Sequence, residues 1–223
     1  MLSKEFNLSN EQIRQFDLYR KLLLEWNEKF NLTAITDEEE IEEKHFIDSL
    51  LPTKFVILNK GKLLDIGSGA GFPGIPLAIY QPNLKVTLLE SNGKKVSFLN
   101  EVVKQLDLKN VTVSNGRAED LKVRSSFDYV TARAVKSLNI LVELSIPFVK
   151  VHGTLLAYKG DRADEEINEA KSALRKLNAK LIEKHLYRLP KSQDNRNLLV
   201  ILKEKEVQKK YPRNYSEIIK NPL

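Results

Sequence analysis

The chain has 223 residues, of which 42% are hydrophobic and 30% charged, a composition typical of a soluble globular protein with one well-buried core. It contains no cysteine, and its three histidines are scattered, which excludes a disulfide, a thiolate nucleophile and a zinc–thiolate site. No apolar run is long enough to span a bilayer, and the first residues lack the apolar region of a secretory signal. We therefore expect a cytoplasmic protein that needs no metal and enters no membrane.

The net charge of +6 is unevenly distributed along the chain. Residues 1–60 carry eight basic and twelve acidic side chains, a balance of −4, whereas residues 61–202 carry 22 and 15, a balance of +7. Residues 203–223 carry six and three, a balance of +3. A basic body and tail behind an acidic leader favour a polyanionic partner, although charge scattered evenly over the surface would give the same totals.

The first 60 residues carry the pattern of a helical leader. Ser9 and Gln12 form a capping box that begins a helix, in which apolar residues then recur every three or four positions. A second capping box, at residues 36–39, predicts another helix that ends near Pro52. We expect the apolar stripe of the first helix to pack into the core; its members are Ile13, Phe16, Tyr19, Leu23, Trp26 and Phe30.

From residue 62 the pattern changes to strands that alternate with helices. Such alternation predicts a parallel sheet covered by helices on both faces. The last two strands are joined only by residues 190–194, so they must pair antiparallel. The expected strands cover residues 62–67, 85–91, 110–115, 127–135, 153–160, 179–189 and 195–204, and the expected helices after the leader cover 74–80, 93–108, 138–149 and 164–177.

This arrangement predicts an α/β fold of the Rossmann-like class I methyltransferase type, in which a mostly parallel sheet ends in an antiparallel hairpin. We expect three segments: an N-terminal helical extension over residues 1–60, a methyltransferase domain over 61–203 and a basic C-terminal tail over 204–223. Dinucleotide dehydrogenases usually continue with a second domain, for which little chain remains.

The stretch LLDIGSGAGFPGIP, residues 63–76, follows the first strand and fits two cofactor patterns. The Gly-x-Gly-x-x-Gly pattern that begins at Gly69 matches the dinucleotide fingerprint, but its turn then begins two residues late and Asp65 has no role. Asp65-x-Gly67-x-Gly69 matches the methyltransferase pattern, in which the acid holds the cationic methionine end of the cofactor, directly or through water. Gly67 and Gly69 lack a Cβ atom and let the backbone approach the cofactor.

Polar residues follow the next two strands at corresponding places. Glu90 ends the second strand, where an acid accepts hydrogen bonds from the ribose hydroxyls of an adenosine. Ala118 and Glu119 follow the third strand and suit an adenine edge. Each acid could instead cap or solvate the start of a helix, but their succession after three strands favours S-adenosyl-L-methionine as the cofactor.

Several motifs spread over nearly the whole chain are specific enough to indicate a family. They are WNEKFNLTAI, HFIDSL, LLDIGSGAGFPGIPLAI, LLES-x-x-KK-x-x-FL, GRAED, FDYVTARAV, the KG of LLAYKG and the tail YPR…K-x-PL. With these motifs the chain resembles the RsmG family, also called glucose-inhibited division protein B, whose members are 16S ribosomal RNA guanine-N7 methyltransferases. The resemblance implies a cytoplasmic enzyme that methylates one guanine in the decoding region of the small-subunit RNA. It also implies cofactor contacts at Gly67, Phe72, Ala118, Glu119 and Arg133.

The C-terminal tail is where the chain departs from this family. The family tail often continues from YPR into a turn rich in Gly and Pro, whereas this chain reads YPRNYSEIIKNPL. The resemblance therefore implies less about the tail, and about its part in RNA contact, than about the rest of the chain.

The residue types that are missing restrict the methyl acceptor. Carbon-5 of a pyrimidine needs a cysteine nucleophile, and the chain has none. Exocyclic amines are usually served by an (N/D)PP(Y/F) loop after the fourth strand, where this chain has residues 131–135, TARAV. Hydroxyl acceptors need a base or a metal, for which no His-rich or Asp-rich cluster is present. Guanine N7 carries an unprotonated lone pair, so alignment with the sulfonium methyl suffices.

Basic residues near the strand ends are therefore candidates for positioning, and no catalytic base is named. Arg133 ends the fourth strand. Because an arginine that gripped N7 would block methylation there, we assign Arg133 to the cofactor or to a flanking phosphate, with a surface ion pair as the alternative. Lys159, at the end of the fifth strand, is a candidate for an RNA phosphate, and Arg196 is a weaker one.

Two further groups of residues carry expectations. His45 and Asp48 lie three residues apart on a helix, and we expect a local hydrogen-bonded pair rather than a catalytic pair. Their match to the HFIDSL motif of the family implies that they line the substrate cleft, without assigning them a role. Lys94, Lys95 and the run from Lys203 to Arg213 are expected to be solvated faces that an RNA can use, which would make binding sensitive to salt.

The expected function is methyl transfer from S-adenosyl-L-methionine to guanine N7 of 16S rRNA, by a monomer whose partner is the rRNA or the small ribosomal subunit. A small-molecule methyltransferase is one alternative, and it would show no salt-dependent RNA binding. A non-catalytic ribosome-assembly factor is another, and it would bind the particle without transferring a methyl group. A dinucleotide oxidoreductase is the least favoured.

Overall fold

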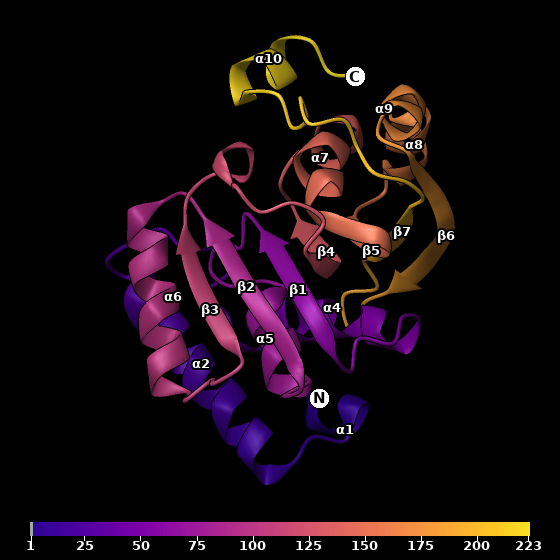
Figure 1. Ribbon diagram of the computed structural model, residues 1–223. Helices are drawn as coiled ribbons and strands as arrows, with labels where there is room; N and C mark the ends of the chain where they lie inside the picture. The colour runs from indigo at the N-terminus through magenta and orange to yellow at the C-terminus, as the bar shows by residue number, and fades with distance from the viewer. Residues whose placement is uncertain (1) are drawn as a thin grey trace.

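The centre of the molecule is one seven-stranded sheet, seen in a computed structural model that describes residues 2–223 (Figure 1). Its strands are β1 (Gly61–Ile66), β2 (Leu84–Glu90), β3 (Val111–Asn115), β4 (Phe127–Arg133), β5 (Val149–Lys159), β6 (Ala179–Arg188) and β7 (Asn195–Lys203). They lie in the order β3-β2-β1-β4-β5-β7-β6. The first five are parallel, and β7 pairs antiparallel with β5 and β6. The predicted fold class, a mostly parallel sheet that ends in an antiparallel hairpin, is confirmed.

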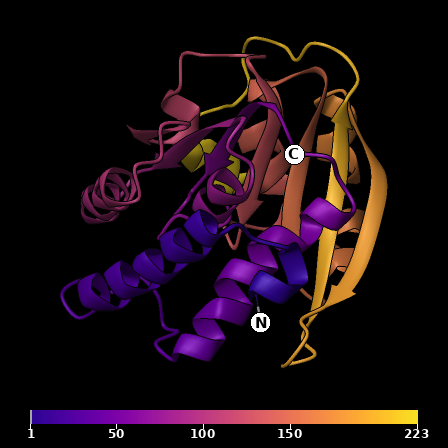
Figure 2. The same ribbon diagram turned by 90° about the horizontal axis from the view of Figure 1, so that it is seen from below.

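Helices cover both faces of this sheet (Figure 2). The first face carries α1 (Leu2–Phe6), α2 (Asn10–Asn27), α3 (Glu38–Ile41), the π-helical turn η1 (Glu42–Ile47), α4 (Asp48–Leu50), the 3₁₀ turn η2 (Leu51–Lys54), α5 (Gly74–Tyr80) and α6 (Gly93–Gln105). The second face carries η3 (Ala118–Asp120), α7 (Leu138–Ser145), η4 (Ile146–Phe148), α8 (Ala163–Glu169), α9 (Lys171–Lys176) and α10 (Tyr215–Lys220). Because successive strand side chains point to opposite faces, Leu63 packs on the first face and Leu64 on the second.

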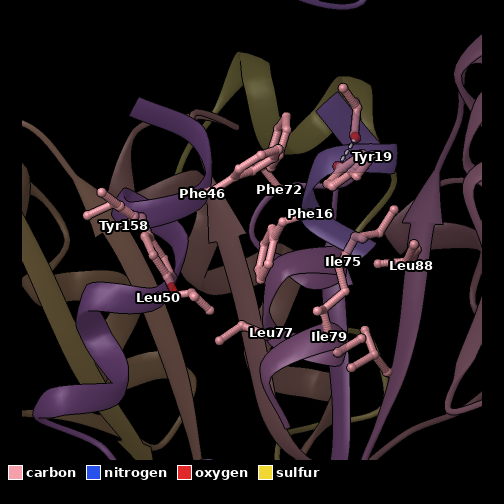
Figure 3. Close-up of a cluster of buried hydrophobic side chains, with 14 of the residues drawn as sticks. Phe16, Tyr19, Phe46, Leu50, Phe72, Ile75, Leu77, Ile79, Leu88 and Tyr158 are labelled. Atoms are coloured by element: carbon pink, nitrogen blue, oxygen red, sulfur yellow. Dashed lines mark hydrogen bonds between the residues drawn. The ribbon is translucent and has the colours of Figure 1, made fainter. Parts of the chain in front are cut away.

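The helical leader shares its core with the sheet (Figure 3). Phe16, Tyr19 and Phe46 are buried in the same cluster as residues of β1, β2 and α5. The hydroxyl of Tyr19 donates to the carbonyl of Ala70 at 2.5 Å, so the leader is also hydrogen-bonded to the loop after β1. Most of the predicted apolar stripe of the first helix is therefore directed inward, as expected.

Three predicted boundaries are wrong for local reasons. The second helix of the leader is capped by Asp37, whose side chain accepts from the Glu40 amide at 2.9 Å, and not by Thr36. The expected helix over 138–149 ends at Ser145, because Pro147 has no amide hydrogen for an α-helical bond. The chain then turns through η4 into β5, which starts at Val149 rather than at residue 153.

The C-terminal tail packs on the protein. The expectation that Lys203 to Arg213 form a solvated face holds for Lys205, Lys209 and Lys210, which are exposed, but not for the two ends of the run. Lys203 is fully buried, and its Nζ donates to the Val149 carbonyl and the Ser125 hydroxyl, both at 2.8 Å. Arg213 forms an ion pair of 2.6 Å with Glu143 on α7, which is also fully buried. The cationic side chains at the two ends of this run therefore bind partners within the protein and are not available to an RNA.

Candidate active site

The glycine loop lies between β1 and α5, at the carboxyl edge of the sheet. Gly67, Gly69 and Gly71 have φ angles of +66°, +61° and +101°, a region that side chains other than glycine rarely adopt. A Cβ atom on Gly69 would lie no closer than 3.9 Å to its nearest neighbour, so this part of the loop faces open space. The backbone at Gly69 can therefore be approached closely by a ligand.

The other two loop glycines have a packing role. A Cβ on Gly71 would lie 2.6 Å from the Tyr19 hydroxyl, and one on Gly74 would lie 2.3 Å from Leu88 Cδ2. These contacts leave no room beside Gly71 for a pyrophosphate, which the dinucleotide fingerprint needs at that position. The geometry thus favours the methyltransferase pattern, in which Gly67 and Gly69 face the ligand.

Asp65 lies beneath the loop and has no exposed surface. Its Oδ1 accepts from the Thr131 hydroxyl at 3.0 Å, and its Oδ2 accepts from the Gly74 amide at 3.2 Å. Burial raises the pKa of Asp65 to about 6, against the opposing effect of these hydrogen bonds. The carboxylate therefore ties β1 to β4 and to the start of α5.

Glu90 supports the same loop from the neighbouring strand. Its Oε2 accepts from the Gly69 amide at 2.9 Å, and its Oε1 accepts from the Asn92 amide at 2.8 Å. Ala118 and Glu119 follow β3 in η3 and line a cavity of about 260 Å³ together with Gly67. The sheet therefore brings the residues predicted after three successive strands to one edge.

Arg133, at the end of β4, forms the centre of a second cluster. Its Nη1 donates to Asp48 Oδ2 and to the Lys44 carbonyl, both at 3.1 Å, and its Nη2 lies 3.3 Å from His45 Nδ1. The guanidinium lies 5.1 Å from the ring centre of Phe72, within the range of a cation–π contact. Arg133 is thus a largely buried anchor rather than a surface ion pair.

His45 is neutral and has a defined tautomer. A guanidinium can only donate, so Nδ1 of His45 accepts from Arg133, and Nε2 donates to the Thr33 hydroxyl at 2.8 Å. Burial and the charge of Arg133 lower the pKa of His45 to about 3. Its ring stacks on Phe72 with centroids 4.3 Å apart. In place of the expected local pair of His45 and Asp48, Arg133 donates a hydrogen bond to each of the two residues.

The π-helical turn η1 explains how three groups from one segment reach the same guanidinium. A π-helical turn adds a residue to the helix and shifts the side chains that follow it; such turns are frequent at functional sites. Here His45 and the Lys44 carbonyl belong to η1, and Asp48 begins the next helix. The sequence of this turn has no distinct residue pattern that predicts it.

A second cavity, of about 390 Å³, lies beside this cluster and is lined by His45, Asp48, Arg133, Lys159 and Arg196 among others. Lys159 forms an ion pair of 2.7 Å with Glu166, and only 8% of its side chain is exposed. An RNA phosphate at Lys159, the predicted contact, would therefore have to compete with the carboxylate of Glu166. Arg196 lies 3.5 Å from Asp48.

The remaining surface of the described chain offers no second candidate site that contains the predicted residues. A larger groove, of about 850 Å³, lies at the amino ends of the strands, and Lys62, Lys85 and Thr112 are among its lining residues. None of the predicted site residues lines it. Within residues 2–223, no group of three or more His, Cys, Asp or Glu side chains could hold a metal ion. In the same range, no helix combines the length and the apolar character of a membrane span.

Comparison with known proteins identifies the family of this site. Residues 12–207 match the family model for rRNA small subunit methyltransferase G, GidB. The chain belongs to this family. Ribosomal RNA small subunit methyltransferase G of Lactococcus lactis is 46% identical over 225 residues, which cover 98% of this chain and 94% of the relative. The protein of the same name from Streptococcus pyogenes is 49% identical over 224 residues, with the same coverage.

A solved structure shows the same fold at low sequence identity. The crystal structure of M. jannaschii TYW2 in complex with AdoMet superposes with a TM-score of 0.56 at 21% identity, over 70% of this chain and 73% of that one. Family membership makes the chain an S-adenosylmethionine-dependent rRNA methyltransferase. The predicted family, enzyme class and cofactor are thereby confirmed.

Proposed function

We propose that the chain transfers a methyl group from S-adenosyl-L-methionine to N7 of one guanine in the decoding region of 16S rRNA. The cofactor supplies an electrophilic methyl group on a positively charged sulfur. The protein then has only to position the guanine, because the N7 lone pair lies in the ring plane and carries no proton that a catalytic base would have to remove. Well-oriented reactants account for roughly 7–11 kcal/mol of a barrier.

The residues around the glycine loop fit this cofactor. Gly67 lines the same cavity as Ala118 and Glu119, and Gly69, two residues further on, offers backbone without a Cβ atom that faces open space. Each carboxylate oxygen of Glu90 accepts one backbone bond and keeps a second lone pair for a ribose hydroxyl. Asp65 supports the loop from below, and Phe72 and Arg133 bound the methionine end.

The observation that carries the choice of N7 is the state of His45. It is the only histidine at the second cavity, yet its Nδ1 is occupied by Arg133 and its pKa is about 3. A group with so low a pKa is a weak proton acceptor at neutral pH. The site is therefore suited to aligning an acceptor that has no proton to lose, and the second cavity takes the guanine.

The partner is 16S rRNA, either free or in the small ribosomal subunit, and the enzyme acts as a cytoplasmic monomer. Arg196 and Lys44, which both line the second cavity, supply positive charge for phosphates that flank the guanine. Lys159 acts through its ion pair with Glu166 to hold the loop after β5 in place. Such phosphate contacts weaken as the salt concentration rises.

The first test uses the chain with methyl-labelled S-adenosylmethionine and small subunits from cells that lack this gene, beside naked rRNA and tRNA. Labelled RNA is then treated to cleave the chain at N7-methylguanosine, and Arg133→Gln protein serves as the control for contaminating activity. We expect label in small-subunit rRNA and one cleavage site. Label without cleavage would exclude N7. Cofactor binding without any labelled RNA would favour the small-molecule methyltransferase or the assembly factor.

A further inference from the structure

The C-terminal segment from Arg213 onward lies outside residues 12–207, the part of the chain that matches the family model. It nevertheless returns to the carboxyl edge of the sheet, where α10 lies beyond the strand ends in Figure 1 and contacts α7. The amide of Arg213 donates to Glu143 Oε1 at 3.0 Å, and its guanidinium donates to both carboxylate oxygens, at 2.8 and 2.6 Å. Ile218 of α10 is fully buried in the core of the second face. The segment is therefore anchored at two points.

Between these anchors, Tyr215 lies at the cavity that Ala118 and Glu119 line. Its ring lies 5.5 Å from the guanidinium carbon of Arg117 and 6.0 Å from Nζ of Lys136, and both of these residues line the same cavity. Cations at this distance from a tyrosine ring are attracted to its face. The cavity thus has an aromatic wall that is contributed by the tail and held by cations from the loops after β3 and β4.

We propose that Tyr215 is the outer wall of the adenine subsite, so that the C-terminal segment completes the cofactor pocket. This inference rests on the proposed cofactor site. Ala118 and Glu119 then meet the edge of the adenine, and the phenol ring covers one side of the flat base. Contacts between a base and an aromatic side chain depend on area and on π-character, so a tyrosine or a phenylalanine provides them and an aliphatic residue does not.

The placement gives the divergent tail a function other than RNA contact. Arg213 and Ile218 fix where the segment runs, and Asn214 begins α10 by accepting from the Glu217 amide at 3.1 Å. Tyr215 follows directly and is half-buried. Folding of the tail and formation of the adenine subsite are therefore coupled.

The test measures binding of S-adenosylhomocysteine and of free adenosine by titration calorimetry. We expect Tyr215→Ala to weaken both ligands about tenfold, because the contact is made to the base, whereas Tyr215→Phe keeps the affinity within about twofold. Ser216→Ala is the matched control, because Ser216 is the next residue of α10 and is exposed. It should leave both affinities unchanged.

The outcomes separate this inference from the proposed function. If the wild-type chain binds neither ligand, the proposed cofactor site is wrong. If it binds both and Tyr215→Ala binds them equally well, only the inference about Tyr215 is overturned. If Tyr215→Ala does not fold, nuclear magnetic resonance of the wild-type chain decides: added adenosine should shift the ring protons of Tyr215 upfield, and unchanged signals would overturn the inference.

Discussion

Arg133 gathers its partners from residues that are distant in the chain, and His45 is the partner whose chemistry it changes most. The guanidinium charge beside the buried imidazole makes protonation of His45 unfavourable and lowers its pKa to about 3. The hydrogen bond to Thr33 holds the other nitrogen in its protonated form. A histidine that a sequence motif places near a substrate cleft is here a rigid acceptor and not a base.

This depressed pKa predicts a dependence of stability on pH. In the unfolded chain His45 binds a proton below about pH 6.5, whereas in the folded chain it stays neutral down to about pH 3. Its stabilising contribution is therefore complete above pH 6.5 and is lost as the pH falls toward 3. Between pH 7 and pH 5 we expect the free energy of unfolding of the wild type to fall by about 1–2 kcal/mol more than that of His45→Asn, measured by urea unfolding.

Asn offers an acceptor near the position of Nδ1 but has no group that titrates in this range. The matched control is His152→Asn, because His152 is exposed and its φ of +66° is one that Asn tolerates. Between pH 7 and pH 5, the free energy of unfolding of His152→Asn should fall by as much as that of the wild type. Equal losses in wild type and His45→Asn would contradict the assignment. The raised pKa of Asp65 makes the free energy of unfolding increase as the pH falls. Because Asp65 is present in every variant, its contribution cancels when the variants are compared.

At the scale of elements, Gly74 and Gly93 both occupy the first residue of a helix but differ in their surroundings. A Cβ at Gly74 would lie 2.3 Å from Leu88 Cδ2, whereas one at Gly93 meets no atom of the described chain within 4 Å. We expect Gly74→Ala to lower the free energy of unfolding by about 1–3 kcal/mol. Gly93→Ala should be neutral or stabilising by up to about 1 kcal/mol. Thermal or urea unfolding checks both, and similar values for the two would contradict the packing role of Gly74.

The elements themselves were largely predictable, and the errors have local causes. Alternating and helical periodicity placed all seven strands of the sheet, and β1, β2 and β3 lie within one residue of their predicted starts. The start of β5 was missed because Ile146–Val149 are apolar and suit either a helix or a buried strand. The π-helical turn was missed because it has no distinct residue pattern, and α10 because a six-residue helix depends on its tertiary contacts.

At the scale of the whole molecule, the leader and the sheet share one hydrophobic core. Phe16, Tyr19 and Phe46 are buried among residues of α5 and the sheet. Loss of a buried aromatic side chain costs about 3–5 kcal/mol, and a whole domain is stable by only about 5–15 kcal/mol. We therefore expect a chain of residues 61–223 to lack a cooperative thermal transition by circular dichroism. A sharp transition near that of the full chain would mean that the predicted segment 61–203 folds without the leader.

Local patterns along the chain were enough to predict the succession of strands and helices, the cofactor loop and the family, because periodicity, glycine placement and motif spacing are local properties. The sequence also placed Glu90, Ala118 and Glu119 correctly at one sheet edge, since parallel strands carry their carboxyl ends to the same side. Which charged side chains have partners inside the fold follows from packing alone. Lys159 pairs with Glu166, Lys203 donates to the Val149 carbonyl, and Arg213 pairs with Glu143. Partners such as these come together only when distant segments pack, and no local pattern records them.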